Sequence, residues 1–471
     1  MKKRIKLSIY LLLFLYPSIS YANETTLIHG KILGYKKGKI VLSFFSNKNK
    51  LEKSLILFDV NQNGEFEAEI IIEESQIIKL KYNEEEIDIY IKPREKIGLL
   101  IDHSSKPPAI TYFEKDNKQD NTIYQNYTGK FGPKKIFLTA NVTISSSLYY
   151  QVKELKTSQD KYDLLNSVYN DEKVFLDDID NKTASLDFLN YIISEIADNH
   201  STYLLTFVKE NELKQKDQEK YLQKITADRK HKSSIFYISF LETYSKCSCE
   251  KELGRALDYY QDFSLLYKCI NKLETLDEET KEKLSGRLIY YNIKPGSIKE
   301  LRLTFEDYKK SAIDLTLFEE INDRYKLAES LQGGQQAPEF TLEDSFGKSI
   351  ALKDFKGKKV YISFWAKWCG VCIAKIKKSN KNRIRLKDES IVFVFISIDE
   401  NKTAWTNHSI TNNQPGIHLW GGGIKNRLMK DFGIVSLPRD FLLNEEGVFI
   451  GNFPSPDSNS FVEYITNKSK D

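Results

Sequence analysis

Two cysteines separated by two residues are the part of this chain whose types and spacing could do chemistry. Cys369 and Cys372 stand in a Trp-Cys-Gly-Val-Cys stretch, residues 368–372. Two thiols at this spacing can close and open one small disulfide ring, which is the chemistry of thiol–disulfide exchange. The apolar run 360–365 predicts a buried strand and residues 373–382 predict a helix. Cys369 should therefore lie at a helix N-terminus, where unpaired N–H groups and the helix dipole stabilise a thiolate.

A zinc site is the alternative for a Cys-x-x-Cys pair. A structural zinc ion needs four ligands, and the sequence contains no second Cys-x-x-Cys pair and no histidine pair at the spacing of a zinc finger. The strand-to-helix context is instead typical of a redox pair. We therefore predict redox chemistry with no metal and no cofactor.

The N-terminal residues predict a secreted protein. Lys2, Lys3, Arg4 and Lys6 precede the apolar run 7–15, and small residues end the segment at Ala22. This pattern is typical of a cleaved signal peptide over residues 1–22, although an uncleaved membrane anchor stays open. The predicted location is the periplasm or cell envelope.

Net charge gives no reason to expect a nucleic-acid partner. The formal charge of the whole chain is +4. The predicted signal peptide carries four basic residues and no acid, so the charge becomes zero once it is removed. A neutral chain with scattered charges lacks the basic patch that nucleic-acid binding requires.

The rest of the chain is long enough for about three domains. Residues 23–114 contain short apolar and alternating runs with turn signals such as Asn63-Gly64, which predict an antiparallel β-sandwich or barrel. A polar connection is expected around residues 115–126. Residues 145–331 have apolar residues three and four apart and few glycines, so we predict an all-helical domain there.

A glycine pair at Gly333-Gly334 ends the helical pattern. From residue 334 to residue 471 strands alternate with helices: a short hairpin, the strand before the cysteines, their helix, a buried strand at 391–398, two helical stretches, two closing strands and a last helix. The predicted fold is therefore multidomain, with an all-β domain, an all-α domain and a C-terminal α/β domain.

This C-terminal domain resembles the thioredoxin superfamily, in particular the TlpA-like branch of secreted disulfide reductases. The matching segments occur in the family's order and are Gly334–Phe340, Phe364–Cys372, Ser397–Asp399, Gly433–Pro438 and Phe441–Leu443. The two upstream domains resemble more faintly the domains that precede such reductases in Bacteroidetes-type secreted proteins.

The resemblance implies a role for each residue of a candidate site. Cys369 would be the attacking thiolate and Cys372 the resolving thiol. Pro438 would be a cis proline whose preceding backbone pairs with the substrate chain, and Trp368 and Leu437 would line the substrate groove.

Two departures from the family pattern bear on the pKa values of the thiols. Ser363 stands where thioredoxins usually hold a buried acid, so water is expected to accept the proton during resolution. Lys375 stands where many TlpA-like reductases carry an acid, and a cation there would favour the thiolate. A peroxidase of the peroxiredoxin type is disfavoured, because Ala366 stands where its Thr-x-x-Cys motif has threonine.

Three further cysteines lie in the predicted helical domain. They are Cys247, Cys249 and Cys269. In an oxidising compartment we expect one of the first two to form a structural disulfide with Cys269 and the other to remain a buried free thiol.

We therefore predict a periplasmic thiol-disulfide oxidoreductase that acts as a disulfide reductase. Its partners would be protein disulfides and a membrane-bound thiol that donates electrons, and the upstream domains would serve partner choice or homodimerisation. The alternative is a cell-envelope binding protein in which the Cys369–Cys372 disulfide is structural.

Overall fold

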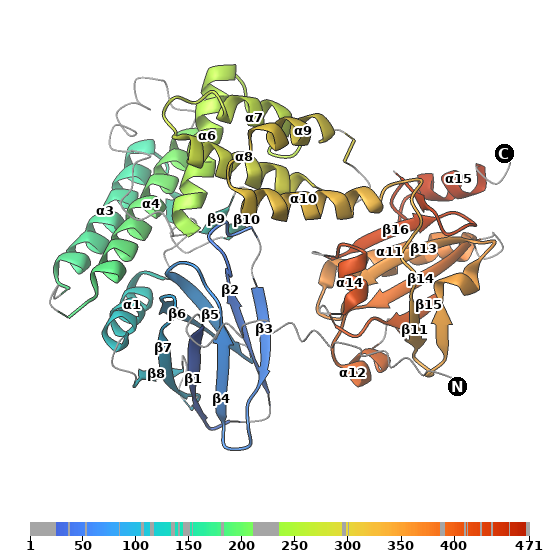
Figure 1. Cartoon of the computed structure of the whole chain (residues 1–471), viewed down its shortest axis with the longest axis horizontal. Helices are drawn as coiled ribbons and strands as arrows, with labels where there is room; N and C mark the ends of the chain where they lie inside the picture. The colour runs from blue at the N-terminus through green and yellow to red at the C-terminus, as the bar shows by residue number, and fades with distance from the viewer. Residues whose placement is uncertain are drawn as a thin grey trace, which may run out of the picture. The chain divides into compact units, whose positions relative to one another are not determined.

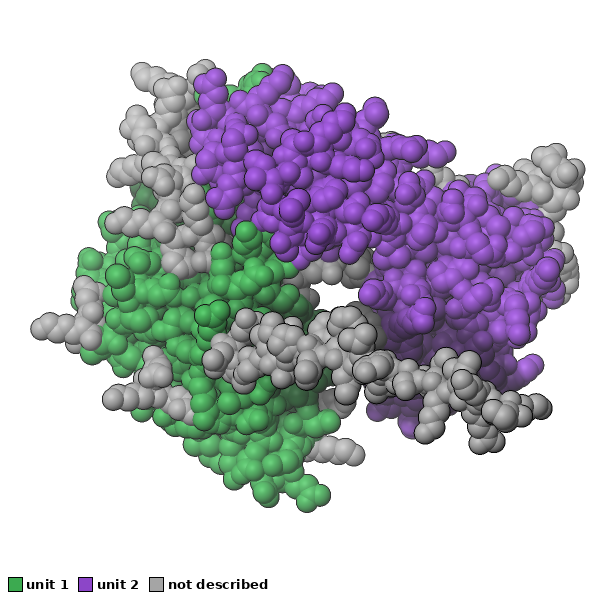
Figure 2. All heavy atoms as spheres, viewed as in Figure 1, with its two compact units in different colours: residues 1–252 green, residues 253–471 purple. Residues whose placement is uncertain are grey.

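The computed structural model describes most of the chain after residue 24. The described residues are 25–35, 38–51, 54–83, 85–104, 108–113, 117–132, 137–139, 142–144, 151–152, 154–179, 183–210, 235–293, 298–299, 301–386, 391–408, 411, 413–423, 426–434, 437–451 and 453–467. The predicted signal peptide, residues 1–22, lies outside them. The chain divides into two compact units, Met1–Glu252 and Leu253–Asp471, which Figure 2 colours green and purple.

The first unit contains two four-stranded sheets. One sheet has the strand order β4-β1-β7-β8 and the other has the order β3-β2-β5-β6. The strands are β1 Thr26–Leu33, β2 Lys39–Phe44, β3 Ser54–Asp59, β4 Glu65–Ile70, β5 Gln76–Tyr82, β6 Glu85–Ile91, β7 Lys96–Asp102 and β8 Ala109–Tyr112. Both sheets contribute to one apolar core that includes Ile28, Ile40, Ile78 and Ile97.

Alternation along each strand decides which residues enter this core. In β4 the three glutamates are exposed while Phe66, Ala68 and Ile70 are buried, as expected for a strand with one wet face. The prediction of a purely antiparallel domain was wrong at one pair, because β1 and β7 run parallel. A parallel pair needs a long crossover connection, and residues 34–95 between these strands supply it.

A helix also lies where the sequence predicted a polar connection. Helix α1 covers Lys118–Phe131 and buries Ile123, Tyr124, Tyr127 and Phe131, which share one face because Tyr127 lies three or four residues from each of the others. The prediction was wrong because the asparagines and glutamines among them mask this apolar stripe. The remaining elements of the unit are β9 Phe137–Thr139, β10 Val142–Ile144, α3 Ser158–Asp177, α4 Leu186–Glu210 and α6 Ile235–Leu253.

The second unit begins with four helices. They are α7 Phe263–Ile270, α8 Glu278–Asn292, α9 Arg302–Ser311 and α10 Leu315–Ser330. Asp277 and Asp314 cap α8 and α10 by accepting backbone N–H bonds of the first turn. The helical character of the region is as predicted, but the division between the two units falls inside it.

The C-terminal region folds into a seven-stranded sheet with the order β12-β11-β15-β14-β13-β16-β17. Its elements are β11 Thr341–Asp344, β12 Ser349–Ala351, η3 Leu352–Phe355, β13 Lys359–Trp365, α11 Gly370–Arg385, β14 Ile391–Ser397, α12 Lys402–Thr406, β15 Ile417–Trp420, α14 Arg427–Asp431, β16 Arg439–Leu443, β17 Phe449–Ile450 and α15 Asn459–Asn467. The predicted order of strands and helices is confirmed, apart from β15, which the sequence analysis did not assign.

Helices cover both faces of this sheet. On β13, Tyr361 packs against Phe461 of α15, with ring centroids 5.9 Å apart. Phe364 points to the opposite face and packs against Phe432, which directly follows α14. The core also takes in Leu331, so the domain uses a residue from before the predicted boundary at 334.

Candidate active site

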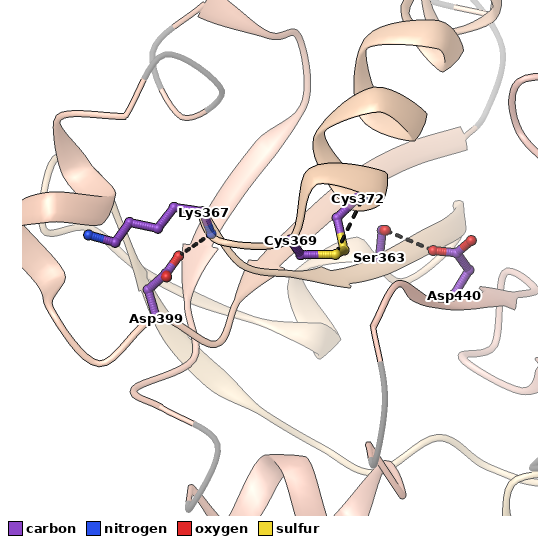
Figure 3. Close-up of a disulfide and its surroundings, with 6 residues drawn as sticks. All are labelled: Ser363, Lys367, Cys369, Cys372, Asp399 and Asp440. Atoms are coloured by element: carbon purple, nitrogen blue, oxygen red, sulfur yellow. Dashed lines mark hydrogen bonds between the residues drawn. A yellow bond between two sulfur atoms is a disulfide. The ribbon is translucent and has the colours of Figure 1, made fainter. Parts of the chain in front are cut away.

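The Cys369–Cys372 pair lies where the central strand β13 gives way to helix α11. Cys369 is the N-cap of α11, and its Sγ forms a disulfide with Cys372 across a Cα–Cα distance of 5.3 Å. The same sulfur accepts the Cys372 backbone N–H at 3.3 Å (Figure 3). When the disulfide is reduced, this N–H and the helix dipole favour a thiolate at Cys369.

Both cysteines are buried. Cys369 is 7% exposed and Cys372 is 1% exposed in this disulfide form. The first cysteine is the more accessible of the two, as a nucleophile must be, but it does not stand free at the helix terminus. Trp368, which directly precedes Cys369, is 66% exposed.

Asp399 fixes the loop that leads into the cysteines. Its buried carboxylate accepts the backbone N–H of Lys367 at 2.9 Å (Figure 3). The same carboxylate accepts the hydroxyl of Ser397 at 2.8 Å. Its carbonyl accepts the Trp420 indole N–H at 2.7 Å. In the sequence, Asp399 is recognisable only as part of the segment Ser397–Asp399 that matches the family, because nothing there shows that its carboxylate reaches back to residue 367.

The predicted cis proline is confirmed. The Leu437–Pro438 peptide bond is cis, and both residues are half-buried. They precede β16, which pairs antiparallel with β13 so that Arg439 lies opposite Phe364. Pro438 therefore lies at the end of β13 that leads to the cysteines. The substrate-binding roles of Trp368, Leu437 and Pro438 stay predictions.

The two residues expected to tune the thiols share one acid that the sequence analysis missed. Ser363 donates its hydroxyl to Asp440 Oδ1 at 2.7 Å, and the Lys375 ammonium pairs with Asp440 Oδ2. Lys375 therefore does not act as an isolated cation, because a carboxylate balances its charge. The missing signal was the strand register, which places Asp440 directly opposite Ser363.

Of the other three cysteines, two are disulfide-bonded and one is free, in the numbers that the sequence predicted, although the free thiol is half-buried rather than buried. Cys249 and Cys269 are both disulfide-bonded, while Cys247 is a free thiol. Burial raises the pKa of Cys247 to about 11. This thiol is therefore protonated at neutral pH and is a poor nucleophile.

The described residues offer neither a metal site nor a membrane-spanning helix. Within the described ranges, no group of three or more His, Cys, Asp or Glu side chains is arranged to hold a metal ion. None of the helices described there is long and apolar enough to cross a membrane.

Comparisons with known proteins agree with this geometry. Residues 333–450 match the model of the AhpC/TSA family. The thiol-disulfide oxidoreductase ResA of Bacillus anthracis is 32% identical over 120 residues, which are 25% of this chain and 68% of that protein. The chain belongs to the TlpA-like thiol-disulfide oxidoreductases of the thioredoxin superfamily.

Further relatives match a similar share of this TlpA-like oxidoreductase. ResA of Bacillus cereus (strain ATCC 10987 / NRS 248) is 27% identical over 158 residues, 33% of this chain and 88% of the relative. A thiol:disulfide interchange protein from Bacteroides sp., solved in solution, is 27% identical and covers 30% of this chain and 95% of its own, with a TM-score of 0.27. These matches cover a third of the TlpA-like oxidoreductase or less.

Proposed function

We propose that this protein is a periplasmic disulfide reductase that works through the Cys369–Cys372 pair. The observation that carries the proposal is the position of Cys369, whose sulfur caps α11 and accepts the Cys372 N–H. A thiolate formed there attacks one sulfur of a substrate disulfide and gives a mixed disulfide. Cys372 then attacks Cys369, releases the reduced substrate and closes the internal disulfide.

The substrate is a protein disulfide held against the surface around the pair. Trp368 offers an exposed aromatic face beside Cys369, and the backbone before Pro438 offers N–H and C=O groups to an extended substrate chain. Leu437 adds an apolar contact next to that backbone. The upstream domains contribute none of these residues, so their part is partner choice or homodimerisation.

The reductase direction requires a source of electrons outside the cytoplasm. Each turnover leaves Cys369 and Cys372 oxidised, and a membrane-bound thiol must reduce them again by a second exchange. The periplasmic location rests on the sequence pattern of residues 1–22.

A steady-state assay tests the activity. The protein without residues 1–22 should catalyse the reduction of a protein disulfide by a small dithiol, and Cys369→Ser/Cys372→Ser should not. Cys247→Ser should retain the activity, because its neutral thiol takes no part. A rate for the parent protein equal to that of the double variant would contradict the proposal and favour a structural disulfide.

A further inference from the structure

A nearly buried carboxylate bonds to Ser363, close to the disulfide, from a strand that carries neither cysteine. The side chain of Asp440, on β16, is 10% exposed. One of its oxygens accepts the Ser363 hydroxyl at 2.7 Å and the other pairs with the Lys375 ammonium. The carboxylate is thus held by groups from both β13 and α11.

The strand register explains why Ser363 and Asp440 meet. They are direct partners across the antiparallel pair of β13 and β16, so their side chains lie on the same face of the sheet. Tyr361, two residues before Ser363, points to the face covered by α15. Ser363 and Asp440 therefore face the side of the sheet that also carries α11, since Asn382 of α11 donates to Pro456 and Ser458 just before α15.

Helix geometry brings Cys372 to the same place. Cys372 and Lys375 are three residues apart on α11 and therefore share a face of the helix. The ammonium of Lys375 reaches Asp440, so the face that carries Cys372 also looks toward this carboxylate. In Figure 3 the Ser363 side chain lies between the disulfide and Asp440.

Resolution of a mixed disulfide requires an acceptor for the proton of the buried Cys372 thiol. Cys372 must lose its proton before its sulfur can attack Cys369. Cys372 is 1% exposed and Ser363 is 2% exposed, so bulk water has little access to the thiol. The hydroxyl of Ser363 can both accept and donate a proton, and the Asp440 carboxylate is the acceptor to which it is already bonded.

We propose that Asp440 accepts the Cys372 proton through the Ser363 hydroxyl during resolution, a role that rests on the exchange mechanism proposed above. The thiol proton passes to Ser363 Oγ while the Ser363 proton passes to Asp440 Oδ1. The Cys372 sulfur then bonds to Cys369 Sγ, and the bond between Cys369 and the substrate sulfur breaks. The substrate leaves as a thiolate, so the cysteine pair is oxidised by two electrons and the substrate is reduced by two.

Lys375 completes this arrangement. An unbalanced carboxylate next to Cys372 would oppose the thiolate by charge repulsion, and the ammonium offsets that cost. Tyr361 on β13 and Arg439 on β16 also interact with Asp440, and Asp457 interacts with Lys375. Burial and the neighbouring Asp440 hold the pKa of Tyr361 well above its ordinary value, so Tyr361 stays protonated and does not compete as the acceptor.

A two-phase reaction separates attack from resolution. The reduced protein in a Cys247→Ser background is mixed with an aromatic disulfide whose released thiolate is coloured. The first equivalent of colour reports attack by Cys369 and the second reports resolution by Cys372. At neutral pH, Asp440→Asn should change the rate of the first phase by less than about threefold relative to the parent protein. It should slow the second phase about 100-fold, which is the usual contribution of a positioned acid or base.

The pH dependence gives a readout that a structural role would not move. In Asp440→Asn the second phase should accelerate about tenfold per pH unit, because the thiol must then ionise without an internal base. In a Cys369→Ser background, alkylation should show that Asp440→Asn lowers the pKa of Cys372, because a negative charge has been removed. Proton transfer from Cys372 through Ser363 to Asp440 therefore predicts that the variant has more Cys372 thiolate and yet resolves the mixed disulfide more slowly.

Matched variants make the test decisive. Asp344→Asn alters an aspartate at the end of β11, three strands from β13, and should leave both phases unchanged. Ser363→Ala removes one hydroxyl and should also slow the second phase. This variant provides the test if Asp440→Asn does not fold. A second phase as fast in Asp440→Asn, or in Ser363→Ala, as in Asp344→Asn would overturn this proton transfer. Loss of the first phase in the parent protein would instead overturn the proposed function.

Discussion

Replacing Cys369 by serine should lower the rate of disulfide exchange at least about 10³-fold, because it removes the proposed attacking sulfur at the N-terminus of α11. Cys372→Ser should behave differently. It leaves the proposed attacking sulfur in place and removes the thiol proposed to resolve the mixed disulfide. Substrates should therefore accumulate as covalent adducts on Cys369, which non-reducing gels and mass spectrometry of the linked peptide would reveal.

The buried position of Cys372 gives this prediction its asymmetry. Its side chain is 1% exposed against 7% for Cys369, so a substrate disulfide should rarely reach it. Cys369→Ser should consequently trap almost nothing. Equal trapping by the two single variants would mean that both sulfurs are accessible, and the assignment of attacking and resolving thiols would have to be abandoned.

Two tryptophans three residues apart should differ in what their mutation changes: stability for Trp365 and activity on protein disulfides for Trp368. Trp365 ends β13 with no exposed surface, and its ring lies 5.5 Å from that of His408. Trp365→Ala should destabilise the domain by about 3–5 kcal/mol, because it removes a large apolar side chain and leaves a cavity. Trp365→Phe keeps most of the volume and should cost less. Chemical denaturation of the variants measures both.

Trp368 is the matched control on the same loop. It is 66% exposed, so Trp368→Ala should change the free energy of unfolding by no more than about 0.5 kcal/mol. Its kcat/KM for a protein disulfide should fall about tenfold, the effect of one lost aromatic contact, while reduction of a small disulfide should be unchanged. A loss of stability at Trp368, or equal losses for both substrates, would remove it from the substrate surface.

Local patterns predicted much of the C-terminal fold because its elements are strongly marked. The apolar run of β13 is buried at every residue, and β14 is buried at all but Val392, so their periodicity was unambiguous. Strand β15 was missed because it has four residues between a Pro-Gly turn and three glycines. Helix α1 was missed because polar residues interrupt its apolar stripe.

The site shows where sequence reasoning stops. The cysteines and Pro438 were predicted because short motifs mark them. Asp440 was not, because its role depends on a cross-strand partner 77 residues earlier and on a lysine of another element. Ser363 and Lys375 looked like two separate departures from a family pattern until the strand register placed one carboxylate between them.

The reduction potential of the Cys369–Cys372 pair tests most directly whether this disulfide is made for exchange. The protein without residues 1–22 would be equilibrated with dithiol and glutathione buffers, and the pair would be quantified by alkylation and mass spectrometry. A redox-active pair should titrate as one two-electron couple between about −120 and −280 mV, as exchange enzymes do. A potential below about −300 mV, with the pair resistant to reduction in the folded protein, is typical of a structural disulfide and would contradict the assignment.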